Sequence, residues 1–164
     1  MIALMKCIRA NRRFPLHGPE HHAMVPGIML ATYRNLGGDV REETLLFAIE
    51  RGTRMPGGSC GYMGACGAAV GVGVGFSALL GSTPLASKTR ARVNRIVAEV
   101  LQKIAERDAP RCCQRESYIA LKEAERISRG LLDRPLVARE SILCAQSGLN
   151  KECIKGACPL YPRQ

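Results

Sequence analysis

Seven of the eight cysteines in this 164-residue chain lie in three short clusters. Structural cysteines usually occur singly, as small apolar groups in a core, whereas metal centres, iron–sulfur clusters and thiol couples require several thiols together. The clusters are Cys60 and Cys66 in a glycine-rich loop, the vicinal pair Cys112 and Cys113, and Cys144, Cys153 and Cys158 near the C-terminus. We predict these seven as metal ligands, with an iron–sulfur cluster as the leading cofactor and zinc as the alternative.

The first cluster lies in the loop GGSCGYMGACGAAVG, which precedes an apolar helix. Cys66 is expected at the N-terminus of that helix, where the helix dipole favours its thiolate. The glycines between Cys60 and Cys66 give the loop enough slack to bring both sulfurs to one centre. A tight turn with incidental cysteines is the alternative interpretation.

The vicinal pair is expected to supply one ligand. Side chains of adjacent residues diverge, so only one of Cys112 and Cys113 should reach a given ion, and Arg111 and Arg115 would favour its thiolate. The alternative is one buried and one half-exposed thiol at the start of a helix.

The C-terminal cysteines have the spacing C-x8-C-x4-C-P. A proline after the last cysteine is common in iron–sulfur loops, whereas the C-x2-C pair typical of zinc ribbons is absent. Few large apolar residues lie in this segment. We therefore expect Cys144, Cys153 and Cys158 to gather around one metal, with a fourth ligand from the rest of the fold.

All three histidines and one carboxylate fall within the segment LHGPEHH. His17, Glu20, His21 and His22 offer ligands to a metal or groups for acid–base work, although the HExxH motif of zinc helices is absent. Side chains of adjacent residues point to opposite sides of a regular backbone, so only one of His21 and His22 is expected to join Glu20 at a site. A structural role for the histidines is the alternative.

The elements that must position these groups are helical. We predict an all-α fold, a bundle of five to six helices with a glycine-rich central helix and an irregular, cysteine-rich C-terminal tail. Apolar periodicity and turn residues predict helices over residues 2–10, 23–36, 39–51, 65–80, 88–107 and 116–131. We assign residues 1–140 to a helical bundle domain and residues 141–164 to a tail packed on the same domain.

Local signals refine these boundaries. Pro26 is expected in the first turn of its helix, because proline is tolerated there and not in a helix interior. Asp39 is expected to cap the next helix, with Glu42 three residues later as in a capping box. Only residues 135–143 have strand character, and it is weak.

Glycines recur every four residues in the central helix, at Gly67, Gly71 and Gly75. Such a stripe lets another helix or a cofactor approach closely, at a cost of about 1 kcal/mol of helix propensity for each glycine relative to alanine. Close helix packing and cofactor binding are the two interpretations, and the same stripe allows a symmetric homodimer. The uncharged run over residues 65–80 is shorter than the roughly 18–20 residues that cross a bilayer, so we expect no membrane span.

The net charge is +10, and residues 83–164 hold 16 of the 24 basic residues. Lys88, Arg92 and Arg95 are expected on one helix face, which suits an acidic protein partner or an anionic cofactor. Only 4% of the residues are aromatic and no DNA-binding motif occurs, so nucleic acid is the less favoured partner. Residues 70–75 contain GxGxG, but no strand precedes them, which excludes the βαβ unit of a methyltransferase that binds S-adenosylmethionine (SAM).

Four motifs together resemble a known family. LHGPEHHAMVPG, PGGSCGYMGACGAAVGVG, PRCCQRESYIAL and NKECIKGACPLYP are similar to an uncharacterised domain of methanogenic archaea and anaerobic bacteria, over residues 16–162. That domain often occurs beside or within class I SAM-dependent methyltransferase-like proteins. The resemblance implies that these motifs form one site in an anaerobic, metal-rich metabolism, with a methyltransferase or redox protein as partner. The helix–loop–helix arrangement is also distantly similar to small redox-active proteins named for their C-GCAxxG-C-C cysteines.

These patterns favour a cytoplasmic iron–sulfur or other metal-binding accessory protein for electron, one-carbon or sulfur transfer. Eight cysteines without a secretory signal indicate a reducing compartment. The alternative is a thiol–disulfide redox module, or a zinc-stabilised interaction module without catalysis. No residue is assigned as catalytic.

Overall fold

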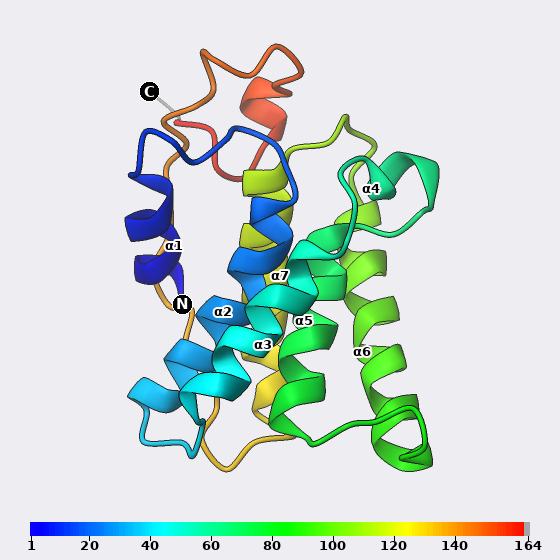
Figure 1. Cartoon of the computed structure of the whole chain (residues 1–164). Helices are drawn as coiled ribbons and strands as arrows, with labels where there is room; N and C mark the ends of the chain where they lie inside the picture. The colour runs from blue at the N-terminus through cyan, green and yellow to red at the C-terminus, as the bar shows by residue number, and fades with distance from the viewer. Residues whose placement is uncertain (163–164) are drawn as a thin grey trace.

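The computed structural model describes residues 1–162, and within them the chain is all-helical, which confirms the predicted fold class (Figure 1). Seven α-helices and one short 3-10 helix occur in this range, without a strand. The helices are α1 (Ile2–Arg9), α2 (Glu20–Asn35), α3 (Glu42–Thr53), α4 (Ser59–Tyr62), α5 (Gly67–Leu79), α6 (Ser87–Ala105), α7 (Cys113–Ser128) and the 3-10 helix η1 (Lys155–Ala157). No helix in the described range is long and apolar enough to cross a membrane.

Helices α2, α3, α5, α6 and α7 run alternately down and up the bundle (Figure 1). The segments that precede α2, α5 and α7 therefore meet at one end, which we call the loop end. These segments carry the histidines, the glycine-rich loop and the vicinal cysteines. Helical alternation thus brings together three motifs that lie far apart in the sequence.

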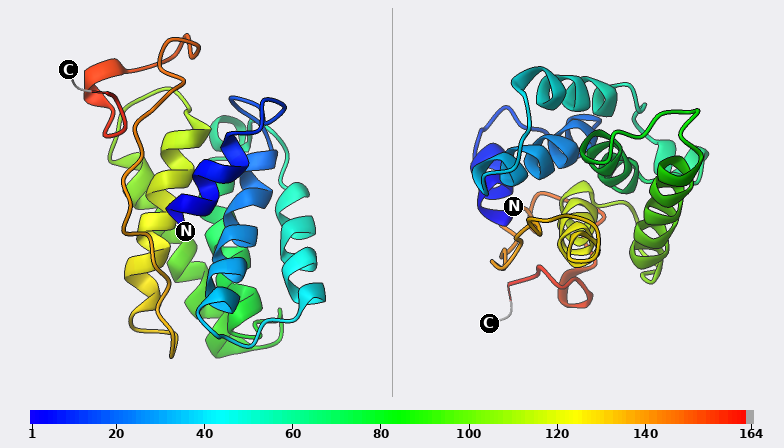
Figure 2. Two further views of the ribbon diagram at one scale, coloured as in Figure 1. Left: turned by 90° about the vertical axis from the view of Figure 1, so that its left-hand side faces the viewer. Right: turned by 90° about the horizontal axis from the view of Figure 1, so that it is seen from below.

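The C-terminal segment returns to the loop end as extended chain. After α7, residues 133–144 run back between α1 and α7 (Figure 2). The N-terminal amine of Met1 donates to the carbonyl of Val137 at 2.6 Å, and Nζ of Lys122 donates to the carbonyl of Ala138 at 2.6 Å. The weak strand expected over residues 135–143 is not formed, because helices rather than strands flank this segment and side-chain or terminal donors satisfy its carbonyls.

The glycine stripe of α5 packs against α2. A Cβ on Gly71 would lie 2.9 Å from the carbonyl oxygen of His22, and a Cβ on Gly75 would lie 2.7 Å from Cε of Met29. A Cβ on Gly67 would meet the ring of His22 at 2.1 Å. Close helix packing is therefore confirmed for the stripe, and it is buried inside the bundle, where it cannot form a dimer surface.

The position of Pro26 differs from the expectation and explains this packing. Because α2 begins at Glu20, Pro26 lies inside the helix and not in its first turn. Proline has no N–H to donate to the carbonyl four residues earlier, so the carbonyl of His22 is released from helical hydrogen bonding. A Cβ on Gly52 of α3 would lie 2.7 Å from that same carbonyl oxygen. Helices α2, α3 and α5 thus meet at the carbonyl of His22.

The start of α3 also differs from the expectation. The residue that precedes α3 is Arg41 in an extended conformation, not Asp39, and it makes no side-chain capping bond. The acidic residues Glu42 and Glu43 fill the first turn of α3 instead, where the helix dipole favours negative charge. The assignment of a tail over residues 141–164 includes residues 163–164, which lie outside the described range.

Substituting Gly71 tests the close approach of α5 to α2. Gly71→Val adds a branched side chain where even a Cβ is too close to backbone, and overpacking of a core costs about 1–3 kcal/mol or more. We expect the free energy of unfolding, measured by urea denaturation and circular dichroism, to fall by about 3 kcal/mol. Gly130→Val is the control, because nothing lies within 4 Å of a Cβ there. Equal losses in the two variants would contradict the packing.

Candidate functional site

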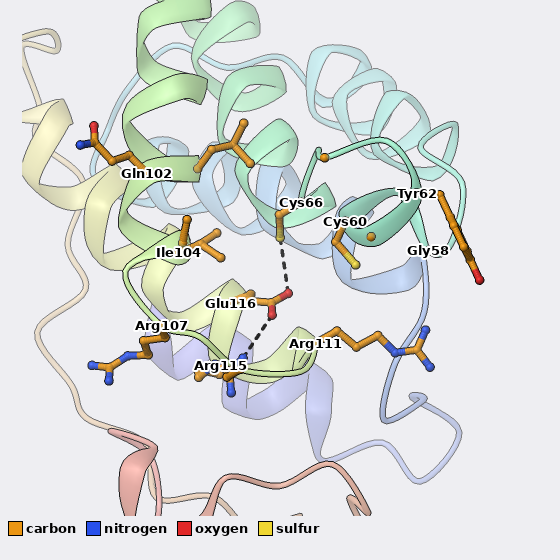
Figure 3. A pocket seen from close by; sticks show the side chains of 15 residues that line it. Gly58, Cys60, Tyr62, Cys66, Gln102, Ile104, Arg107, Arg111, Arg115 and Glu116 are labelled. Carbon is orange, nitrogen blue, oxygen red and sulfur yellow. Dashed lines mark hydrogen bonds and ion pairs between the residues drawn. The ribbon is translucent and has the colours of Figure 1, made fainter.

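A cavity of about 250 Å³ lies at the loop end, between the histidine segment, the glycine-rich loop and the start of α7. We call it the histidine–cysteine cavity. Its walls contain all three histidines, three thiols and one carboxylate, contributed by His17, His21, His22, Cys60, Cys66, Cys113 and Glu116. It adjoins an open groove along α6, which shares Cys60, Cys66 and Glu116 with it (Figure 3).

A second, much smaller cavity lies beneath the tail. Its volume is about 20 Å³, and we call it the tail cavity. Four cysteines line it, Cys112, Cys144, Cys153 and Cys158. The three tail cysteines therefore line one cavity, and the fourth cysteine comes from the start of α7.

The vicinal cysteines are divided between the two cavities. Cys112 precedes α7 and lines the tail cavity, whereas Cys113 begins α7 and lines the histidine–cysteine cavity. Because their side chains diverge, only one of the pair was expected to reach a given ion. In the structure, each thiol lines a different cavity.

A buried carboxylate at the start of α7 links the two cavities. The thiol of Cys66 donates to Oε2 of Glu116 at 3.5 Å (Figure 3). The backbone N–H of Cys112 donates to Oε1 of Glu116 at 3.0 Å. The guanidinium of Arg115 lies 3.4 Å from Oε1 and also donates to the carbonyl of Pro110 at 2.8 Å. Glu116 and Arg115 are both buried, so each needs the other to offset the cost of burying its charge.

The expectation of an easily formed thiolate at Cys66 is wrong. Cys66 does precede α5 directly, and the N–H groups of Ala68 and Ala69 favour its thiolate. Burial, reinforced by the negative charge of Glu116, outweighs them and raises the pKa of Cys66 to about 12. Cys66 is therefore a protonated thiol that donates a hydrogen bond.

The vicinal thiols follow the same rule. Burial raises the pKa of Cys112 and of Cys113, and for Cys112 it outweighs the nearby positive charge of Arg115. The sequence suggested that the flanking arginines would favour a thiolate at one of the two cysteines. In the structure, burial outweighs this effect at both. All eight cysteines of the chain are free thiols in this structure.

The histidines have different environments. Nε2 of His21 lies 3.1 Å from the carbonyl of Pro15, and the guanidinium of Arg9 lies 3.2 Å from both ring nitrogens. The ring also packs edge-on against Phe14, with centroids 4.9 Å apart. Both nitrogens are thus engaged, and burial, with the charge of Arg9, lowers the pKa of His21 to about 4. His21 is a neutral structural residue.

His22 and His17 each keep a nitrogen available. Nδ1 of His22 lies 3.0 Å from the carbonyl of Met55, which can only accept, so Nε2 of the neutral ring carries the lone pair. Nε2 of His17 lies 3.3 Å from Oδ1 of Asn150 in the tail. With the proton on Nε2, Nδ1 of His17 becomes the acceptor. This Nδ1 is buried and has no hydrogen-bond partner within residues 1–162.

Glu20 and Cys7 lie apart from these groups. Glu20 is exposed on the first turn of α2 and lines neither cavity, and Glu116 provides the carboxylate instead. Cys7, the one unclustered cysteine, is exposed on α1. Of the predicted cofactor-binding glycines, only Gly67 lines the histidine–cysteine cavity, and Gly71 and Gly75 pack on α2.

Glu116 and Ser117 contribute to the site without having been predicted from the sequence. They lie three and four residues after Cys113, and an acidic residue in the first turn of a helix is a recognisable signal. That signal usually marks an exposed charge interacting with the helix dipole. Only the tertiary structure shows that this carboxylate is buried between two thiol-lined cavities.

Within the described range, no three Cys, His, Asp or Glu side chains are close enough together to hold a metal ion. Both cavities nevertheless gather thiols from segments distant in sequence. Metal binding at either cavity therefore requires side chains in its walls to rotate inward.

A family of unknown function, DUF5714, matches residues 1–161. The chain belongs to this family. The match spans every clustered cysteine and all three histidines, so both cavities lie within the shared domain. No curated protein and no solved structure matches the chain.

The environment of His21 predicts a pH dependence of stability. The unfolded imidazole takes up a proton near pH 6.5, whereas the folded one does so only near pH 4, so acidification between these values favours the unfolded chain. We expect the free energy of unfolding to fall by about 3 kcal/mol over this interval because of His21. His21→Gln should have a correspondingly shallower pH slope in urea titrations. Identical slopes for the two proteins would contradict this assignment.

Proposed function

We propose that this protein is a metal-binding accessory protein whose histidine–cysteine cavity holds an iron–sulfur cluster. One observation carries the proposal. Three buried side-chain polar atoms lack a hydrogen-bond partner within residues 1–162, and two of them, Nδ1 of His17 and Oγ of Ser117, belong to residues that line this cavity. Buried polar atoms are nearly always paired, so such atoms around one cavity indicate that it binds a group that pairs with them.

The donors around the cavity suit iron and sulfide. Cys60, Cys66 and Cys113 supply three thiols, the ligands that iron–sulfur clusters use most. His17 and His22 each offer a ring nitrogen, and imidazole replaces thiolate in some cluster sites. The hydrogen bond from His17 to Asn150 orients the ring, as the outer-shell partners of metal-bound histidines do.

The size of the cavity favours a cluster over a single ion. Its volume of about 250 Å³ is far greater than the roughly 10–15 Å³ that one water-sized group occupies by the same measure. A single ion bound at one wall would leave most of this space unfilled. A cluster with several atoms can reach thiols on opposite walls with modest side-chain rotation.

Binding requires the ligand thiols to lose their protons. Metal ligation takes the thiolate, so protons are released as the metal binds. Cys66 has a high pKa, but its thiol already donates to Oε2 of Glu116 at 3.5 Å. Glu116 is therefore the acceptor placed to receive that proton. A bound cluster would supply one-electron chemistry at this end of the bundle.

The proposed setting is cytoplasmic electron, one-carbon or sulfur transfer in an anaerobic metabolism, with a redox or methyltransferase protein as partner. The free thiols suit a reducing compartment. The groove beside the cavity is lined by Arg107 and Arg111, which suit an acidic partner or an anionic cofactor (Figure 3). Cys60 lines this groove and is exposed, which places one proposed ligand within reach of a partner.

Anaerobic purification and reconstitution with iron and sulfide test the cluster. We expect visible absorbance, with iron and sulfide in stoichiometric amounts, and a loss of most of both in Cys60→Ser, Cys66→Ser and Cys113→Ser. His17→Ala should lower cluster retention by about tenfold or more. Cys7→Ser is the matched control and should retain the cluster, because Cys7 lies outside both cavities.

The opposite results are also informative. A protein that stays colourless after reconstitution, or one in which the cavity variants and Cys7→Ser retain equal iron and sulfide, would refute the cluster. Circular dichroism of each variant separates loss of ligation from loss of fold. A variant that keeps its helical signal and thermal transition but loses iron has lost a ligand.

A further inference from the structure

We propose that the tail cavity is a second, separate metal site, in which Cys112, Cys144, Cys153 and Cys158 hold a single tetrahedral zinc-class ion. These four cysteines come from two segments, the start of α7 and the tail, and they line one cavity. Four cysteines are one of the usual ligand sets of structural zinc sites. The site shares no cysteine with the proposed cluster site, and it does not depend on that cluster.

The size of the tail cavity indicates one ion and not a cluster. Its volume of about 20 Å³ is a little above the roughly 10–15 Å³ needed to admit one water-sized group. An iron–sulfur cluster would need the tail to move away from α7. A single ion fits the existing space once the sulfurs turn toward it.

Two of the four sulfurs already accept backbone hydrogen bonds. The N–H of Gln146 donates to Sγ of Cys144 at 3.4 Å, and the N–H of Lys155 donates to Sγ of Cys153 at 3.4 Å. Each bond joins a cysteine to the second residue after it, so the turn presents N–H groups to the sulfur. Backbone N–H groups that donate to ligand sulfurs are a recurring outer-shell feature of thiolate metal centres. Lys155 adopts φ 48 to make this turn, a conformation that is costly for a residue with a side chain.

Positive charge also surrounds the cavity. Arg115 lines it, and Arg9 lies near Cys112 and Cys144 and donates to Oε1 of Gln146. Four thiolates around a divalent ion carry a net charge of minus two, so nearby guanidinium groups lower the cost of placing that charge in the protein. Both arginines are held by hydrogen bonds to other parts of the loop end.

The tail has little apolar packing of its own. Within residues 141–162, only Cys158 and Leu160 are buried, yet the segment forms a closed loop in which the N–H of Cys144 donates to the carbonyl of Leu160 at 2.7 Å. Ordering such a segment costs conformational entropy. The burial of two residues offsets only a small part of that free-energy cost. Metal ligation supplies this stabilisation in small cysteine-rich segments, and it releases the thiol protons as the ion binds.

Cobalt(II) titration of the full-length reduced protein, before any reconstitution with iron, tests the site. We expect tetrahedral thiolate–cobalt absorbance with one ion per chain, displaced by zinc. Cys112→Ser and Cys153→Ser should weaken cobalt binding by at least about tenfold. Cys113→Ser, one residue from Cys112, is the matched control and should leave this binding unchanged, as should Cys7→Ser.

Other results would overturn the proposal. Loss of the cobalt signal in Cys113→Ser with retention in Cys112→Ser would place the ion in the histidine–cysteine cavity, and no tetrahedral signal at all would show that the tail cavity does not bind the ion. The two proposals fail separately, because the cluster should depend on Cys60, Cys66 and Cys113 and not on the tail cysteines.

Proteolysis gives an independent readout of the same site. With zinc bound, we expect residues 141–162 to resist cleavage, and a chelator should expose them to protease at least about tenfold faster while the helical signal persists. The Cys153→Ser variant should be cleaved rapidly with or without zinc. A tail equally protected in the chelator-treated protein would mean that packing alone orders it, and the tail metal site would be refuted.

Discussion

The arrangement of the loop end depends on the close approach of three helices at one carbonyl group. Pro26 removes the hydrogen bond that the carbonyl of His22 would otherwise accept, and Gly52 and Gly71 allow the backbones of α3 and α5 to reach it. No larger residue fits at either glycine without displacing backbone. The contact fixes the ring of His22 against Gly67, and therefore fixes the first turn of α5 and the position of Cys66 beside it.

The start of α7 divides the loop end into two chemical environments. Cys112 and Cys113 face different cavities. The ion pair of Arg115 and Glu116 is buried in the same first turn of α7. A buried ion pair is costly to form, but the loss of either partner would leave an uncompensated charge. Glu116 also accepts a hydrogen bond from the backbone N–H of Cys112, which ties this ion pair to the start of α7. Adjacent cysteines line two different cavities because the helix begins between them.

Burial decides the resting state of the thiols. Desolvation raises the pKa of Cys66, Cys112 and Cys113, although helix N–H groups act on Cys66 and an arginine acts on Cys112 in the opposite direction. The free-energy cost of placing an unpaired thiolate in a low-dielectric environment exceeds the stabilisation that one or two hydrogen-bond donors provide. In the proposed sites, a metal would compensate the charge of each thiolate directly. In both proposals, metal binding and proton release are one event.

The sequence alone was sufficient for the all-α class, for most helix positions and for the cysteines and histidines that gather at the loop end. Those features are local, because apolar periodicity, glycine spacing and clustered thiols are properties of short segments. The sequence was not sufficient to determine that Pro26 lies within a helix or that both ring nitrogens of His21 are engaged. It also could not show that Glu20 lies outside the cavity and Glu116 lines it. Burial by distant segments decides each of these, since the same side chain is a ligand, a hydrogen-bond donor or a surface group according to what covers it. Only the tertiary structure could assign Cys112 and Cys113 to two cavities, because that assignment depends on how the returning tail packs on the start of α7.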